Sequence, residues 1–303
     1  MLGPKPPRGL WPTQEPEPPE PYTSYSYYEL DSPERWVLYY SPEDSGVERL
    51  IVFVHGFGGD AVTSWLDFPS INLAKPENEW WRHSDLLFVG YKSTSDDISA
   101  VANRIRREIR KFYPRPYSAG LEVDGNQLRK DTTTPYKELI FVGHSLGGVV
   151  LRRVLSDAAQ EWIDKGRPEP RPFILNTLTY MFSPASAGFR AAGWLGFLAA
   201  TSLWTAIETF LSRSSSYTDL QPDSLVLREL RDRTVKYAAQ DEFSALRANI
   251  VWANPDSVVI SERYHTDYVD ATWDGQTHVT VCKPRDQQFN DPWKFISTGE
   301  AYE

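Results

Sequence analysis

The chain has 303 residues, of which 41% are hydrophobic and 14% aromatic, enough apolar material for one large α/β domain or two small ones. Its formal net charge of −9 excludes a general nucleic-acid-binding role, because the neutralisation of phosphates needs a basic surface. The single cysteine, Cys282, excludes an internal disulfide framework and a cysteine-built zinc site.

The N-terminal segment is rich in proline, with eight prolines and three glutamates in residues 1–21. Proline at this density supports neither a helix nor a central strand. We therefore predict a flexible arm over residues 1–30 and a folded domain over residues 31–303. The opening residues also lack the apolar stretch of a signal peptide, so we expect a cytoplasmic protein and leave peripheral contact with a membrane open.

Short continuous apolar runs predict strands at residues 36–40, 50–54, 86–91, 139–142, 178–182 and 250–253. Asp96 and Asp97 begin an amphipathic helix that extends to about Phe112, and a second helix covers residues 149–155. Residues 114–136 are predicted to be an irregular insertion. Strands alternating with helices indicate the α/β class, with a mostly parallel sheet and helices on both faces. Ligands bind such sheets at the carboxyl ends of the strands.

The most informative motif is Gly-His-Ser-Leu-Gly-Gly at residues 143–148, which contains G-x-S-x-G between a predicted strand and a predicted helix. A serine hydroxyl is a poor nucleophile unless a tight turn exposes it beside a base and facing backbone amides. Small residues at positions 143 and 147 suit that turn, because its backbone segments approach closely. The motif predicts Ser145 as a nucleophile.

Five histidines compete for the role of base. Three of them lie before or within the serine motif and are expected to be structural or to point away from the face of the serine: His55, His83 and His144. In a strand–turn–helix elbow the chain order is serine, then acid, then histidine near the last strand. His278 fits this order, and His265 is the alternative.

Asp256 is the leading candidate for the acid, because it directly follows the predicted strand at residues 250–253 and precedes His278 by 22 residues. A carboxylate there would hold the imidazole in the correct tautomer and stabilise the imidazolium. Asp256 could also be an ordinary turn residue in its Asn-Pro-Asp-Ser sequence. The alternatives, if the strand ends elsewhere, are Glu262, Asp267 and Asp270.

Acyl transfer also needs amide donors for a tetrahedral oxyanion. The glycine-rich turn at residues 55–59 follows the strand at residues 50–54, so the amide of Phe57 is predicted as one donor and that of Leu146 as the other. The glycine pair alone could suggest phosphate binding, but the turn has no P-loop lysine.

Together these features resemble the α/β-hydrolase superfamily, and more narrowly the lipase-like serine esterases that include GPI inositol-deacylase-like and serine-active-site-containing proteins. Four segments carry the resemblance: Phe53–Gly59 with Ser64-Trp65, Gly143–Gly148, Asp219–Leu230 and His278–Pro284. It implies a carboxylic-ester hydrolase with Ser145, His278 and Asp256 as its triad. The family's acid typically lies in Gly-x-x-Asp-x-Val-Val-Pro, and the segment around Asp256 lacks that glycine and that proline.

Residues 191–207 contain no charged side chain, and an apolar, lid-like insertion is predicted at about residues 185–215. A core helix is an equal alternative, and residues 189–211 could also contact a membrane surface or another subunit. A membrane span is disfavoured, because Arg190 and Glu208 flank the run within the enzyme domain.

We therefore expect an esterase or lipase that acts on a small-molecule or lipid ester through an acyl-enzyme, without metal or cofactor. The alternatives are acyl transfer by the same triad and a non-catalytic module that uses the fold for binding. Oligomeric state, acyl-chain length and headgroup are not encoded in these motifs.

Overall fold

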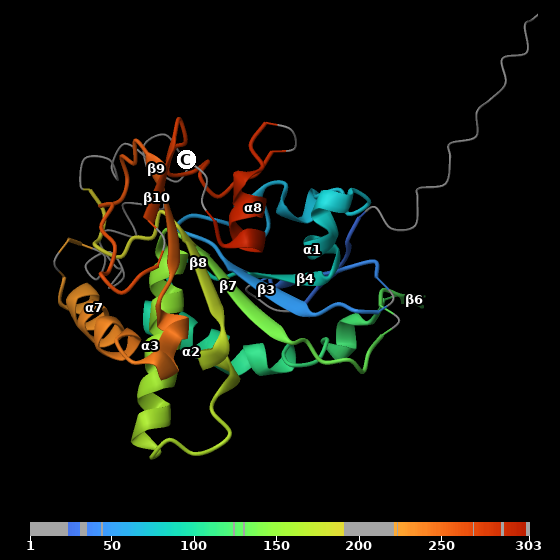
Figure 1. Cartoon of the computed structure of the whole chain (residues 1–303), viewed down its shortest axis with the longest axis horizontal. Coiled ribbons are helices and arrows are strands. Elements are labelled where there is room, and N and C mark those ends of the chain that lie inside the picture. Colours follow the sequence, from blue (N-terminus) through green and yellow to red (C-terminus); the bar gives the residue numbers. More distant parts are fainter. Residues whose placement is uncertain are drawn as a thin grey trace, which may run out of the picture.

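Eight strands form one mixed sheet at the centre of the computed structural model, in the order β1-β2-β4-β3-β7-β8-β9-β10 (Figure 1). The structure describes residues 24–30, 35–43, 45–123, 125–129, 131–190, 221–222, 224–268, 270–285 and 288–300. The strands are β1 (Ser26–Glu29), β2 (Val37–Tyr40), β3 (Arg49–Val54), β4 (Ser84–Val89), β7 (Glu138–His144), β8 (Leu178–Phe182), β9 (Asn249–Asn254) and β10 (Asp270–Asp274). Only the pairs β1–β2 and β2–β4 are antiparallel. The mostly parallel sheet predicted from the sequence is confirmed.

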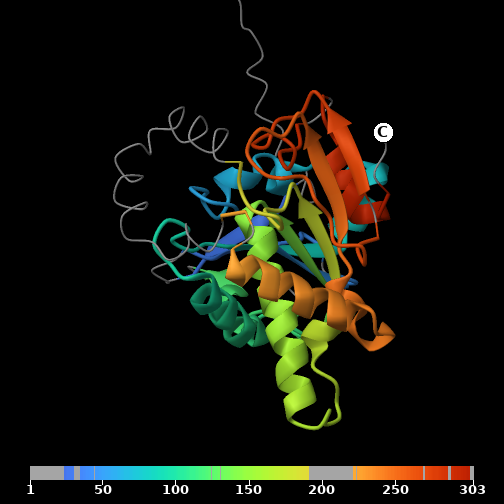
Figure 2. The same cartoon turned by 90° about the vertical axis from the view of Figure 1, so that its left-hand side faces the viewer.

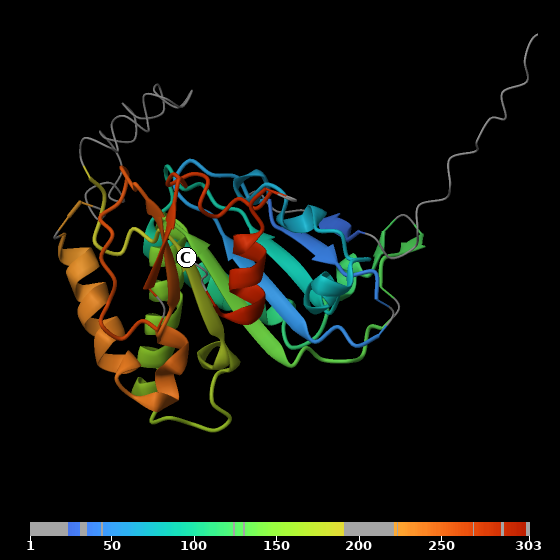
Figure 3. The same cartoon turned by 45° about the horizontal axis from the view of Figure 1, so that its top comes forward.

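Helices cover both faces of this sheet (Figures 2 and 3). One face carries α2 (Ile98–Glu108), α3 (Leu146–Asp164) and α7 (Leu225–Ala238), and the other carries α1 (Glu79–Arg82) and α8 (Asp291–Thr298). Alternate strand residues enter the two apolar cores, Val52 and Val54 on the α3 side and Ile51 and Phe53 on the α8 side. This alternation explains why the central strands are continuous apolar runs, because a parallel strand is buried on both faces.

Short 3₁₀ turns complete the described secondary structure: η1 (Thr63–Trp65), η2 (Phe68–Ser70), η3 (Pro76–Asn78), η4 (Ile109–Lys111), η5 (Ser118–Gly120), η6 (Phe173–Asn176) and η7 (Asp241–Leu246). The helix predicted to reach Phe112 continues from α2 into η4. Its N-terminus is capped by Asp97, whose carboxylate accepts hydrogen bonds from the amides of Ser99 and Ala100.

The carboxyl ends of the parallel strands meet at one edge of the sheet. The ladder pairs Val54 with Gly143, His144 with Phe182, and Phe182 with Val251. The segments that follow β3, β7, β8 and β9 therefore leave the sheet side by side. The sheet therefore brings these segments together at the edge where ligands bind in parallel sheets.

Three strands lie in ranges for which the sequence predicts an arm or an irregular insertion. The strand β1 falls within the range predicted as an arm, and the hairpin of β5 (Glu122–Val123) and β6 (Asn126–Gln127) falls within the predicted irregular insertion. Residues 1–23 and 191–220, which hold most of the arm and of the apolar insertion, lie outside the described residues. In the part of the chain that is described, no helix combines the length and the apolar character needed to cross a bilayer.

Candidate active site

Ser145 occupies a strained turn between β7 and α3, with φ 53° and ψ −120°. A positive φ costs a non-glycine residue roughly 1–3 kcal/mol, so the surrounding packing must hold it. That packing is tight: a Cβ atom added to Gly147 would lie 1.9 Å from the carbonyl oxygen of Val54, and one added to Gly143 would lie 2.9 Å from Gly148. The small residues of the motif thus allow α3 to start directly against β3, which presents the Ser145 hydroxyl at the carboxyl edge of the sheet.

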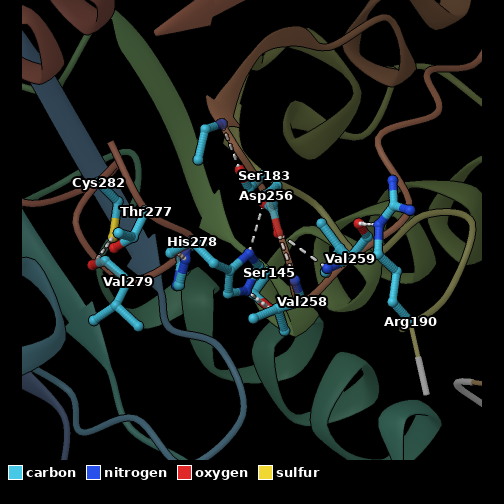
Figure 4. A network of polar contacts seen from close by, with 12 residues as sticks. Ser145, Ser183, Arg190, Asp256, Val258, Val259, Thr277, His278, Val279 and Cys282 are labelled. Atoms are coloured by element: carbon cyan, nitrogen blue, oxygen red, sulfur yellow. Dashed lines mark hydrogen bonds and ion pairs between the residues drawn. The ribbon is translucent and has the colours of Figure 1, made fainter. Parts of the chain in front are cut away.

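His278 lies beside this hydroxyl. Its Nε2 atom is 2.9 Å from Ser145 Oγ, and its Nδ1 atom is 2.9 Å from Asp256 Oδ2 (Figure 4). A carboxylate only accepts hydrogen bonds, so Nδ1 carries the proton of the neutral ring. Nε2 is then the acceptor and the serine hydroxyl is the donor. This is the protonation pattern that a base needs before it activates a hydroxyl.

The Asp256 carboxylate is buried and held by three contacts, one of them the contact with His278. Its side chain is 0% exposed, and its second oxygen, Oδ1, accepts hydrogen bonds from the amides of Val258 (2.9 Å) and Val259 (3.0 Å). Burial alone would raise the pKa of the Asp256 carboxyl, but the hydrogen bond and charge of His278 and the two amides together hold it below its ordinary value. The carboxylate is therefore ionised wherever His278 would serve as a base.

The loop that carries Asp256 is held by the segment that ends at Arg190 (Figure 4). Phe189 forms a β-bridge with Val259, and the Arg190 amide donates to the carbonyl of Val258 at 2.8 Å. Arg190 Nε also donates to the carbonyl of Val259 at 3.0 Å. Val258 and Val259 thus donate their amides to Asp256 while their carbonyls accept hydrogen bonds from Arg190. Sequence reasoning did not find this support, since backbone pairing leaves no side-chain motif.

The other candidate acids have different partners. Asp267 forms a buried ion pair with Arg152 at 2.8 Å, with side chains 0% and 1% exposed, and Glu262 pairs with Arg231 at 2.5 Å. Asp270 begins β10. Among the candidates, the structure joins Asp256 to His278 by a hydrogen bond.

Among the described residues, His278 is the histidine that is hydrogen-bonded to the Ser145 hydroxyl, and the other histidines have different surroundings. His55 is buried against Tyr91, with ring centroids 4.3 Å apart, and its Nδ1 atom lies 2.7 Å from the carbonyl of Gly56. His265 is exposed. His144 is buried, and its Nε2 atom lies 2.7 Å from the backbone carbonyl of His278. From the sequence we expected this ring to point away from the face of the serine. In the structure it holds the backbone of the loop that carries His278.

The two predicted oxyanion donors lie at the same edge. Leu146 is the first residue of α3, where amides have no carbonyl partner within the helix. Phe57 follows Gly56, whose backbone approaches the serine so closely that an added Cβ would lie 2.8 Å from Ser145 Cβ. The glycine-rich turn therefore borders the hydroxyl. Ser183, the residue after β8, is used differently, since its Oγ accepts from the amide of Ala253 at 3.0 Å.

No three metal-binding side chains gather within the described ranges. The arrangement of an oriented hydroxyl, an imidazole and a buried carboxylate can perform general base catalysis and form a covalent acyl intermediate with the chain's own residues.

Residues 45–182 match the family model described as "Putative serine esterase (DUF676)". This segment contains the glycine-rich turn and Ser145 but ends before Asp256 and His278, and it spans less than half of the chain. No curated protein sequence matches the chain.

Solved structures with a similar fold include esterases and lipases. The mature lipase BlEst2 of Bacillus licheniformis is 14% identical, over 85% of this chain and 92% of that one, with a TM-score of 0.47. Esterase B of Lactobacillus rhamnosis is 13% identical, over 91% and 84%, with a TM-score of 0.48. The peroxisomal α/β-hydrolase Lpx1 of Saccharomyces cerevisiae is 10% identical, over 86% and 85%, with a TM-score of 0.45. Similarity at this level does not identify the substrate of this chain.

The sheet order, the helical layers and the family match together give an α/β-hydrolase fold with a serine-esterase-like N-terminal half. The resemblance to α/β-hydrolase serine esterases is confirmed at this level. The family match also supports ester hydrolysis as the general class of activity.

Proposed function

We propose that the protein is a serine hydrolase that cleaves carboxylic esters through an acyl-enzyme intermediate. The observation that carries the proposal is the chain of two 2.9 Å contacts from Asp256 through His278 to Ser145, on a turn strained to φ 53°. A scaffold that only bound ligands would have no use for a strained serine whose hydroxyl is hydrogen-bonded to an imidazole.

In this mechanism Ser145 Oγ attacks the ester carbonyl carbon while His278 Nε2 takes the hydroxyl proton. The amides of Phe57 and Leu146 bind the oxyanion of the tetrahedral intermediate. Its collapse breaks the C–O bond to the alcohol, which leaves with the proton from His278. Water then attacks the acyl-enzyme with His278 again as base, and the acid product and free Ser145 result. Asp256 orients the ring and stabilises the imidazolium.

The proposed substrates are lipid or other acyl esters. The family match supports an ester as the substrate. The uncharged, apolar sequence of residues 191–207 is compatible with a hydrophobic acyl group. Acyl transfer to an alcohol other than water would use the same residues, so product analysis in the presence of an added alcohol separates the two reactions.

A fluorophosphonate probe tests the nucleophile directly. We expect labelling of the wild-type protein at Ser145 and its loss in Ser145→Ala. Hydrolysis of p-nitrophenyl esters should fall by about 10⁴-fold or more in His278→Ala, because the residual rate comes from the oxyanion donors and binding alone.

The exposed His265 supplies the matched control: His265→Ala should turn over esters like the wild type. A folded wild-type protein that neither reacts with the probe nor hydrolyses any ester from acetate to palmitate would refute the proposed function. A large loss in His265→Ala with normal rates in His278→Ala would reject His278 as the base.

A further inference from the structure

A pocket of about 270 Å³ lies next to the serine motif, between the glycine-rich turn and the loop of His278. It is lined by residues 56–60, Thr63 and Ser64, and by His144, Val279 and Lys283. The lining includes residue 57, the proposed oxyanion donor, and we take one of the two ends of a bound ester to extend into this space. The chemistry of the walls therefore bears on which esters fit.

Two charged side chains line the pocket, and they differ in their partners. Asp60 pairs with Arg35 at 3.3 Å and accepts the amides of Val62 and Thr63, both at 3.1 Å. Burial would raise the pKa of the Asp60 carboxyl, but these amides and Arg35 hold it below its ordinary value. This carboxylate is thus ionised and already satisfied by donors of the protein itself.

Lys283 is half-buried and makes no ion pair with any residue that the structure describes. Its backbone is held close in the chain to His278: its amide donates to the carbonyl of Thr280 at 2.9 Å, and the amide of Val281 donates to that of Thr277 at 3.0 Å. The ammonium group is therefore carried on a short turn that starts beside His278.

His144, the third polar group of the pocket, adds no charge. Its burial, and then the nearby charge of His278, lower the pKa of its imidazole to about 3, so the ring is neutral at any pH at which an esterase works. Among the described residues that line the pocket, Lys283 alone carries a charge without an ion-pair partner.

We propose that Lys283 makes the enzyme select esters that carry an anionic group, a carboxylate or a phosphate, close to the scissile bond. The inference rests on the proposed function, and it names the substrate class of that site. The overall charge of −9 repels anions at long range, so a local cation is the means by which such a substrate would be held.

The test compares pairs of esters of similar size, one anionic and one neutral. One pair carries the anion on the acyl side, mono-p-nitrophenyl glutarate against p-nitrophenyl pentanoate, and the other carries it on the alcohol side, 4-butyryloxybenzoate against its methyl ester. The variants are Lys283→Gln and Lys283→Glu, with Lys294→Gln, an exposed lysine of α8, as the matched control.

In at least one pair we expect the ratio of kcat/KM, anionic over neutral, to fall by about fivefold or more in Lys283→Gln and further in Lys283→Glu, as removal of one close charge predicts. Lys294→Gln should keep the wild-type ratio. Raising NaCl from about 20 to about 500 mM should lower the wild-type ratio toward that of Lys283→Gln. The pair that responds identifies the side of the ester that enters the pocket.

A measurement without turnover separates the two proposals. In the Ser145→Ala background, calorimetric binding of both anionic esters is compared with and without Lys283→Gln. Weakening of about fivefold or more supports the pocket even if no ester is hydrolysed, in which case only the proposed function fails. Unchanged ratios for both pairs together with unchanged binding would overturn the role of Lys283, while hydrolysis of the neutral esters would leave the proposed function standing.

Discussion

His278 is held by three contacts, two to its imidazole and one to its backbone carbonyl. Ser145 and Asp256 each lie 2.9 Å from a ring nitrogen, and His144 Nε2 lies 2.7 Å from the carbonyl of the same residue. A carbonyl only accepts, so His144 must carry its proton on Nε2. Its pKa of about 3 keeps the ring neutral, and the hydrogen bond to the carbonyl selects the tautomer, so this donor persists wherever the ring is neutral. His144 is in this view a positioning residue, which acts through the loop of the base.

Replacement of His144 by Phe would keep an aromatic ring near Trp65 but remove the donor. We expect kcat to fall by about 10- to 100-fold with little change in KM, since small misplacements of a base cost this much. His144→Gln, whose amide can reach the same carbonyl, should recover most of the rate, whereas the shorter His144→Asn should not. Steady-state kinetics on p-nitrophenyl butyrate checks this, and equal rates in the Phe and Gln variants would contradict the positioning role.

At the scale of elements, α3 determines the geometry of the elbow. Its N-terminal turn abuts β3, and its C-terminal end closes at Gly166, which has φ +77° and nothing within 4 Å of an added Cβ. An added side chain is thus unfavourable at both ends of the helix, but for different reasons. At the N-terminal end the obstacle is the backbone of a central strand, which cannot move aside, and at the C-terminal end it is the dihedral angle alone.

Gly147→Ala should therefore destabilise the protein by about 3 kcal/mol or more, through the clash with the carbonyls of Val54 and His55. Gly166→Ala, on the same helix, should cost only about 1–2 kcal/mol from its positive φ. Urea unfolding followed by circular dichroism measures both. Similar losses at the two ends would show that the close approach of α3 to β3 is not tight in solution.

At the scale of the whole molecule, the core contains imidazoles that resist protonation. Burial lowers the pKa of His55 to about 4, against smaller opposing effects of the Gly56 carbonyl and Asp60, and lowers that of His144 to about 3. The Nε2 atom of His55 is buried without a hydrogen-bond partner among the described residues. In the unfolded chain both rings titrate near 6.5, so below that pH the unfolded state binds more protons than the folded state.

The free energy of unfolding should consequently be constant above about pH 7 and fall as the pH drops from 6.5 toward 4, by up to about 1.4 kcal/mol per pH unit for each ring. Urea titrations at pH 7.5, 6 and 5 measure this slope. His144→Gln should flatten the slope, and His265→Gln, at an exposed position, should leave it unchanged. A slope that is the same in all three proteins would rule out His144 as a cause of the pH dependence.

The sequence by itself determined the local features. Apolar runs gave the six predicted strands because a strand between two helical layers must be apolar on both sides, and Asp97 was recognisable as a cap because its carboxylate binds amides two and three residues away. The turn around Ser145 was also predictable, since the small residues of G-x-S-x-G are those that a close approach of two backbone segments requires. Chain order nominated Asp256 and His278, although residue order alone left Asp267 and His265 as alternatives.

The tertiary structure decided which of these distant residues meet. Asp267 is bound by Arg152, 115 positions earlier, and His144 reaches a carbonyl 134 positions later. The support of the Asp256 loop by Phe189 and Arg190, and the position of Lys283 in its pocket, likewise depend on how loops leave the sheet edge. Periodicity and turn chemistry are local and can be inferred from neighbouring residues. The pairing of side chains far apart in the chain depends on packing, and no short motif encodes it.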